Sequence, residues 1–217
     1  MEQLQQLPVL DTVEVRVLGS LIEKSRTTPD YYPMTLNGLL AACNQKTSRN
    51  PVVQFDEETV ISALNTLKKR GLISTVTGGA SRATKYKHNL GSVYPLVPAD
   101  LALICLMMLR GPQTPGELNT HAGRLYEFDS IEDVQAALEN LMQGENPYVV
   151  QLPRRSGQKE LRYMHLFAGT PDISQFEVSR EADRGSGNLL EERLAHVEQE
   201  LAELKAAFEQ LMKELNG

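Results

Sequence analysis

The chain has 217 residues and a formal net charge of −6, with 22 Lys or Arg against 28 Asp or Glu. Its 41% hydrophobic and 23% charged residues are typical of a soluble globular protein of one or two domains. The longest apolar run, residues 101–109, is far shorter than the roughly 20 residues that cross a bilayer. The first residues lack a basic and an apolar region, and Cys43 and Cys105 are solitary. We therefore expect a cytoplasmic protein without a secretory signal or a membrane partner.

Charge is unevenly distributed along the chain. Residues 1–97 hold 11 Lys or Arg against 8 Asp or Glu, residues 98–170 hold 6 against 9, and residues 171–217 hold 5 against 11. Such an asymmetry can indicate an anionic partner for the first part. Ordinary solvated surfaces explain a positive excess of three equally well.

Three helices are predicted in the first part of the chain. Asp11 is a good N-cap with Glu14 three residues later, which forms an acidic capping box. Thr35 is expected to cap a short second helix, and Asp56 a long third helix that ends at Gly71.

A hairpin is predicted after these helices. Residues 72–77 and 84–88 are β-rich and flank the small residues 78–81. The order of three helices and a hairpin is that of a winged helix-turn-helix, in which the hairpin is the wing.

The same order returns further along the chain. Pro98 begins an apolar helix, Thr114 and Glu117 form a capping box with Pro115 between them, and Ser130 caps a long helix. A second hairpin is predicted over residues 148–152 and 160–167.

Individual residues also recur between the two parts. In the long helix, Val60, Ala63, Leu64 and Leu67 reappear 74 positions later as Val134, Ala137, Leu138 and Leu141. Residues 85–88 (KYKH) reappear as 162–165 (RYMH), and Thr35 and Leu39 as Thr114 and Leu118. Self-similarity over about 75 residues indicates a duplicated small domain, because solenoid repeats are shorter.

The last segment has a different pattern. Apolar residues alternate four and three positions apart, as in the seam of a coiled coil about four heptads long; these are Leu190, Leu194, Val197, Leu201, Leu204, Phe208, Leu211 and Leu215. The pairs Arg193–Glu198 and Glu200–Lys205 are attractive in a parallel arrangement, which favours a parallel homodimer through this seam. The alternative is one amphipathic helix that folds back onto the rest of its own chain.

The predicted fold class is therefore α+β, mainly α, with two tandem winged helix-turn-helix domains and a C-terminal coiled-coil helix. The boundaries are residues 1–90 for the first winged-helix domain, 91–169 for the second, 170–188 for a linker and 189–217 for the coil.

No enzyme motif is found. The sequence has no phosphate-binding GxxxxGK[ST] loop, no HExxH and no GxSxG, and its four histidines are widely separated. We expect no enzymatic activity, no metal and no cofactor. His88 and His165, which end equivalent strands, are interpreted as structural residues.

Candidate nucleic-acid contacts gather in the first repeat. They lie in the polar loop 44–50, on the exposed side of the third helix and in the wing, and comprise Lys46, Arg49, Asn65, Lys69, Arg82, Lys85 and Lys87. Glu57 and Glu58 oppose this interpretation at the start of that helix. The corresponding helix of the second repeat has no Lys or Arg and would repel phosphate.

Several stretches of the first repeat resemble the YceH-like family of bacterial proteins. They are residues 24–33 (KSRTTPDYYP), 42–52 (ACNQKTSRNPV), 79–82 (GASR) and 85–88 (KYKH). The resemblance covers roughly residues 10–168, and Lys46 and Arg49 match its motif. It implies tandem winged-helix domains in a cytoplasmic bacterial protein, and it supplies no activity and no catalytic residue.

The polar loop has a structural interpretation as well. Asn44 can cap the preceding helix in left-handed geometry, and Asn50 before Pro51 favours a turn.

Two functions remain open. The first is a DNA-binding regulatory protein that acts through the first repeat. The second is a protein-docking adaptor, in which Tyr31, Tyr32 and Tyr86 could anchor the interface.

Overall fold

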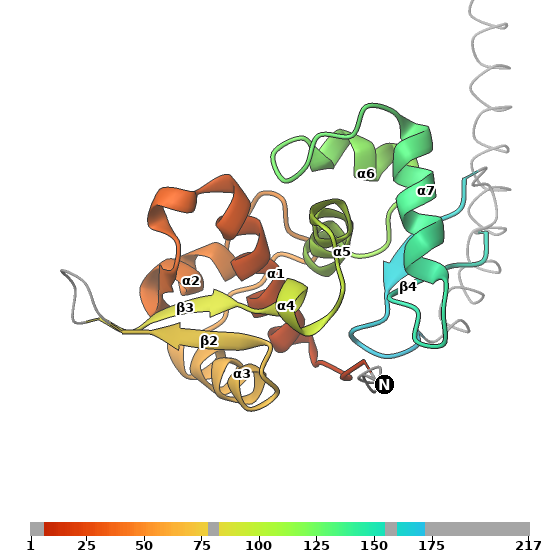
Figure 1. Cartoon of the computed structure of the whole chain (residues 1–217). Helices are drawn as coiled ribbons and strands as arrows, with labels where there is room; N and C mark the ends of the chain where they lie inside the picture. The colour runs from red at the N-terminus through yellow and green to blue at the C-terminus, as the bar shows by residue number, and fades with distance from the viewer. Residues whose placement is uncertain (1–6, 78–82, 155–159, 172–217) are drawn as a thin grey trace, which may run out of the picture. The chain divides into compact units, whose positions relative to one another are not determined.

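The computed structural model describes residues 7–77, 83–154 and 160–171 (Figure 1). The predicted coil, most of the predicted linker and the tip of the first hairpin, including Arg82, lie outside the described residues. The described residues up to 153, together with residues 160–171, belong to one compact unit. The fold is α+β, as predicted, with seven α-helices and small antiparallel sheets among the described residues.

The first half of the unit is a set of three helices and a three-stranded sheet. Its elements are α1 (Thr12–Thr27), a 3-10 turn (Pro29–Tyr31), β1 (Met34–Thr35), α2 (Leu36–Cys43), α3 (Glu57–Lys69), β2 (Ile73–Val76) and β3 (Lys85–His88). The strand order is β1-β3-β2, and all neighbours are antiparallel. The central strand β3 therefore holds together two strands that are about 40 residues apart in the chain.

The predicted start of α1 and the predicted end of α3 are confirmed. Asp11 Oδ1 accepts hydrogen bonds from the backbone of Val13 and Glu14 at 2.8 Å, and Glu14 Oε2 accepts from Asp11 N at 2.9 Å. At the other end of the three-helix set, Gly71 closes α3 with a positive φ of 73°, while Leu72 N donates to Leu67 O. This is the hydrogen-bond pattern of a Schellman cap, for which glycine is favoured.

The second half repeats the helices and has a two-stranded sheet. Its elements are α4 (Leu90–Val93), α5 (Pro98–Arg110), α6 (Pro115–Ala122), α7 (Ile131–Met142), β4 (Val149–Gln151) and β5 (Tyr163–His165). Thr114 and Glu117 form the predicted capping box before α6. The short helix α4 was not predicted, because four residues are too few to show a helical period.

The duplication is visible in the strand register. Met34 of β1 is paired with Tyr86 of β3, and Gln113 forms an isolated bridge with Tyr163. Both partners of the second pair are the repeat equivalents of the first, at shifts of 79 and 77 positions. The two halves therefore place the segment before their second helix against the same position of the returning strand.

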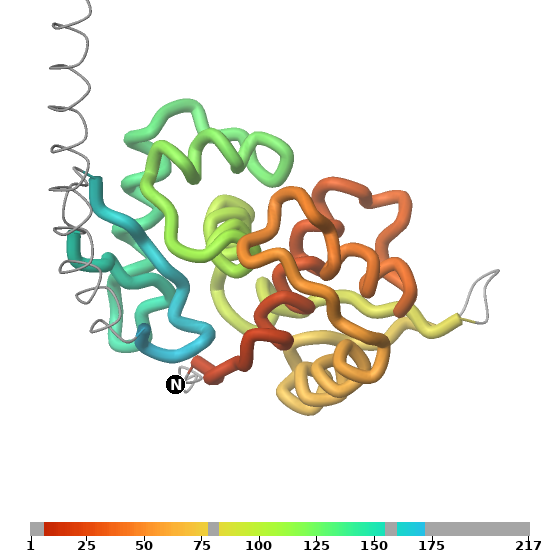
Figure 2. Tube along the Cα trace, turned by 180° about the vertical axis from the view of Figure 1, so that it is seen from behind, coloured from red at the N-terminus to blue at the C-terminus, as the bar shows by residue number. Residues whose placement is uncertain are grey.

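The helix α5 connects the halves. Figures 1 and 2 show it in the middle of the unit, with α1, α2 and α3 on one side and α6 and α7 on the other. All residues from Leu101 to Leu109 are buried. Helix α1 approaches it closely at Gly19, where an added Cβ would lie 3.0 Å from Met108 Cβ, and Cys105 Sγ donates to Gly19 O at 3.3 Å. One core therefore extends through both halves.

Candidate nucleic-acid interface

The polar loop between α2 and α3 is closed by one asparagine. Asn44 Nδ2 donates to Phe55 O, and Phe55 N donates to Asn44 Oδ1, both at 2.8 Å. Asn44 follows α2 with a φ of −88°, so the expected left-handed cap is wrong. Its amide instead copies the pairing of a backbone strand, which fixes both ends of the loop at one point. The residue of the loop with a positive φ, 58°, is Ser48.

Arg49 lies inside this loop and not on its surface. Its side chain is fully buried, and its Nη1 and Nη2 donate to the two carboxylate oxygens of Glu23 at 3.0 and 2.6 Å. The same guanidinium donates to Ala42 O at 3.2 and 2.9 Å and to Gln45 Oε1 at 2.8 Å. Its hydrogen-bonding capacity is therefore used within the protein, and we remove Arg49 from the candidate contacts.

This network stabilises the ionised form of the Glu23 carboxyl. Burial raises the pKa of the carboxyl, but the hydrogen bonds and charge of Arg49, together with Lys24, outweigh burial and lower the pKa overall. Glu23 is thus ionised at neutral pH and ties α1 to the loop.

A second buried arginine supports the same loop. Arg16 of α1 donates through Nη1 to Cys43 O at 3.2 Å and through Nη2 to Pro51 O at 2.6 Å. Burial, followed by the nearby charge of Arg49, lowers the pKa of Arg16. Sequence reasoning missed this residue. The signal that could have found it is its position next to Val17 in the apolar stretch of α1.

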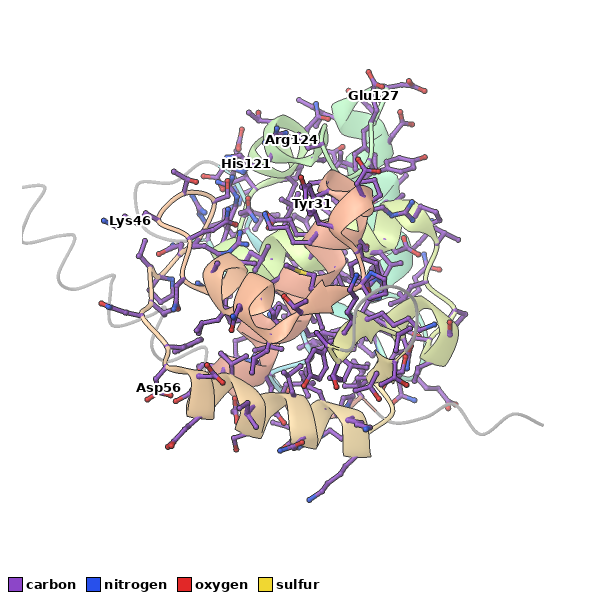
Figure 3. All side chains as sticks on the ribbon, turned by 90° about the vertical axis from the view of Figure 1, so that its left-hand side faces the viewer. Tyr31, Lys46, Asp56, His121, Arg124 and Glu127 are labelled. Atoms are coloured by element: carbon purple, nitrogen blue, oxygen red, sulfur yellow. The ribbon has the colours of Figure 1, made fainter. Side chains whose placement is uncertain are left out.

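Other candidates are at the surface. Lys46, Asn65, Lys69 and Lys87 are exposed, and Lys85 is half-buried. Figure 3 shows Lys46 at the outer end of the loop, pointing away from the body of the protein. Within the described part of the chain, none of these four lysines has a carboxylate oxygen within 4.0 Å. Their charges are available to an anion.

The charges of α3 are segregated along its length. Glu57 and Glu58 occupy the first turn after the N-cap Asp56, whereas Lys68 and Lys69 occupy the last turn. The arrangement suits the helix dipole, which alone would account for it. It also means that only the C-terminal half of α3, with Asn65, presents a surface compatible with phosphate.

The two lysines of β3 lie on the outer side of the sheet. They alternate with Tyr86 and His88, which contact the core or Tyr32, so the strand period of two places both lysines on the other face. His88 N donates to Tyr32 Oη at 2.7 Å, and His88 Nε2 lies 3.2 Å from Ser25 Oγ. Burial lowers the pKa of His88 to about 4, and it does the same to His165. Both histidines are neutral packing residues at pH 7.

The second half offers a different surface. Glu132, Asp133 and Glu139 of α7 are exposed. Arg162 pairs with Glu117, with two N–O distances of 2.9 Å, and donates to Pro112 O at 2.8 Å. Arg162 therefore connects the second hairpin to the first turn of α6.

The described residues include no group of three or more His, Cys, Asp or Glu that could hold a metal ion. None of their helices is long and apolar enough to cross a membrane.

Comparison with known proteins places the chain in a family. Residues 10–158 match the family described as "Protein of unknown function, DUF480". The chain belongs to this family. It is 45% identical over 204 residues to a UPF0502 protein of Solibacter usitatus, a match that covers 94% of this chain and 97% of that protein. A UPF0502 protein of Pectobacterium carotovorum is 44% identical over 208 residues, with 94% of this chain and 98% of that protein covered.

A further DUF480 relative shows the same extent. The UPF0502 protein of Mesorhizobium japonicum is 44% identical over 207 residues, which covers 95% of this chain and 98% of that protein. The family description names no activity.

Proposed function

We propose that this DUF480 protein is a non-enzymatic, DNA-binding regulatory protein that contacts DNA through its first half. The element order α1, β1, α2, α3, β2, β3 and the sheet order β1-β3-β2 support a winged helix-turn-helix in this half. The second half, with its equivalent Gln113–Tyr163 bridge, supports a tandem arrangement.

The observation that carries the proposal is a group of surface lysines that have no carboxylate oxygen within 4.0 Å among the described residues. Lys46 extends from the loop, Lys69 ends α3, and Lys85 and Lys87 lie on one face of β3. Phosphate contacts dominate the affinity of proteins for nucleic acid, and lysines without carboxylate partners are free to make them. Asn65 is exposed on α3, and an asparagine amide has the donor and acceptor that pair with adenine.

The test is fluorescence anisotropy with a mixed-sequence DNA duplex at two salt concentrations. Binding should weaken steeply with salt, and Lys46→Ala/Lys69→Ala/Lys87→Ala should reduce the slope of log K against log salt by up to about 3, one for each lost phosphate contact. Arg154→Ala, which removes an exposed cation outside the first half, is the control and should leave the slope unchanged. Absence of binding at low salt, or a triple variant that binds as the wild type does, would contradict the proposal.

We further propose that the C-terminal seam makes the protein a parallel homodimer. Two DNA-binding units on one dimer would gain avidity if both engage the same duplex. Truncation after Gly185 should then give a monomer in sedimentation. A truncated protein that still sediments as a dimer would place the interface in the winged-helix halves.

One observation favours the adaptor as a second candidate. Tyr31 is 79% exposed, and tyrosine is enriched in interface hot spots. Tyr32 does not share this role, because its hydroxyl accepts from His88 N and burial raises its pKa to about 12. Tyr86 is half-buried against the core. Tyr31→Ser should leave DNA affinity unchanged and abolish binding of a partner recovered with the wild-type protein.

A further inference from the structure

A cavity of about 150 Å³ lies where the two halves of the compact unit meet. Its walls come from the end of α1, the polar loop, the end of α5, and α6 with the residues that follow it. Leu109 is a buried part of its apolar lining, and Thr47, Ser48 and Arg124 are exposed at its edge. No single repeat could form this cavity.

Cations predominate around the cavity. Lys24, Arg110 and Arg124 line it, together with His121. Among the described residues of the lining, the one carboxylate is Glu23, whose two oxygens accept from the buried Arg49 and whose Oε2 also lies 3.2 Å from Lys24 Nζ. Arg49, which is not part of the lining, therefore compensates the negative charge of Glu23. The side chains that line the cavity carry a net positive charge.

Arg110 is the most constrained of these cations. It is half-buried, and its Nη2 donates to Ser48 Oγ at 2.9 Å. Among the described residues no carboxylate oxygen lies within 4.0 Å of its guanidinium. A guanidinium stays charged in a protein, and withdrawing it from water without an anionic partner is costly. A bound anion would supply that partner.

The α6 side of the cavity contributes two further groups. Figure 3 shows His121 and Arg124 next to each other. His121 Nδ1 lies 2.8 Å from Gln113 Oε1, so Nε2 is the ring nitrogen left for a ligand. Arg124 is exposed and makes no ion pair within the described part of the chain.

The size and the donors together define the ligand. An engineered cavity of this volume holds benzene, so the five non-hydrogen atoms of a phosphate group fit inside it with part of a small organic group. A phosphate dianion presents three acceptor oxygens, which match two arginine forks, a lysine and the nearby hydroxyl groups. We propose that this cavity binds a small phosphomonoester, with its phosphate between Lys24, Arg110 and Arg124 and its organic part toward Leu109.

Isothermal titration calorimetry on the full-length protein tests this site. Glycerol 3-phosphate should bind more tightly than inorganic phosphate, and glycerol should not bind, because the charge gives affinity and the organic part adds contact. Arg124→Ala should weaken glycerol 3-phosphate binding at least tenfold. Arg154→Ala is the matched control, since it removes an exposed arginine that lies outside the lining, and it should bind as the wild type does.

A nucleic-acid phosphate is the other source of the same chemistry. If the cavity held a backbone phosphate, duplex DNA would displace glycerol 3-phosphate and Arg124→Ala would weaken DNA binding. Either result would overturn the proposal, as would absence of binding by both phosphate probes at millimolar concentration. An Arg124→Ala protein with wild-type ligand affinity and wild-type thermal unfolding would overturn it as well.

Discussion

Removal of the buried guanidinium of Arg49 should destabilise the protein without removing an exposed nucleic-acid contact. Arg49→Met keeps a side chain of similar length but removes all its donors. Glu23 then keeps only Lys24, at 3.2 Å, while Ala42 O and Gln45 Oε1 lose their donor. Breaking a buried ion pair by removing one partner costs about 3–5 kcal/mol.

We expect the low end of this range for Arg49→Met. The Glu23 side chain is 13% exposed and retains one cation, which moderates its desolvation. A loss of about 3 kcal/mol corresponds to a fall in Tm of about 6–12 °C for a protein of this size. Urea unfolding followed by circular dichroism measures the free energy directly.

The pH dependence of this loss has a defined sign. The pKa of Glu23 is lowered in the folded protein, so its contribution is present above the pKa of the unfolded state and lost as pH falls through the folded value. The difference between wild type and Arg49→Met should therefore narrow as the solution is acidified below about pH 4.

Lys46→Met is the matched control for Arg49→Met. Lys46→Met changes an exposed residue of the same loop and should leave the free energy of unfolding within about 0.5 kcal/mol of wild type. If Arg49→Met unfolds at the wild-type urea concentration and yet loses DNA binding, Arg49 is a surface contact and the network described above is refuted.

Three other substitutions test the packing and the loop. Gly19→Ala places a Cβ 3.0 Å from Met108 Cβ and should cost about 1–3 kcal/mol, whereas an unchanged thermal midpoint would contradict the close approach of α1 and α5. Burial lowers the pKa of His165 to about 4, so below about pH 6.5 this side chain binds a proton when the protein unfolds. Between pH 7 and pH 5 the free energy of unfolding of the wild type should therefore fall about 2 kcal/mol more than that of His165→Gln. Equal losses in urea titrations of the two proteins would refute this expectation. Asn44→Ala leaves the N–H and carbonyl of Phe55 without their side-chain partner and should lower the free energy of unfolding in urea by about 2 kcal/mol. An unchanged free energy would show that other contacts close the loop.

Local sequence signals located the helices well. Asp11 with Glu14, and Thr114 with Glu117, are reciprocal hydrogen-bond pairs whose partners lie three residues apart, so the spacing itself contains the geometry. The closing glycine of α3 is a local signal of the same kind. Helix α4 was not predicted because its four residues are too few to show a helical period.

The roles of the loop cations could not be predicted in this way. Lys46 and Arg49 are three residues apart and equally polar, yet one is exposed and the other is fully buried. The difference depends on Glu23, 26 residues before Arg49, and pairing over that distance leaves no pattern in the sequence. Asn65 and Lys69, in contrast, follow directly from the apolar period of α3.

The cavity was invisible in the sequence for a related reason. Lys24 and Arg124 are 100 positions apart and belong to different copies of the repeat. The repeat relates equivalent positions of the two copies, whereas the cavity brings together positions that are not equivalent.

Helix α1 is surrounded on all sides over much of its length. Every residue from Glu14 to Ile22 is buried, because α5 of the second half covers the side that α2 and α3 leave open. The first copy therefore cannot be cut out as an independent reagent without uncovering a hydrophobic strip, and it would be expected to aggregate. Because the two halves share one core, a substitution in α5 is expected to affect the stability of both halves.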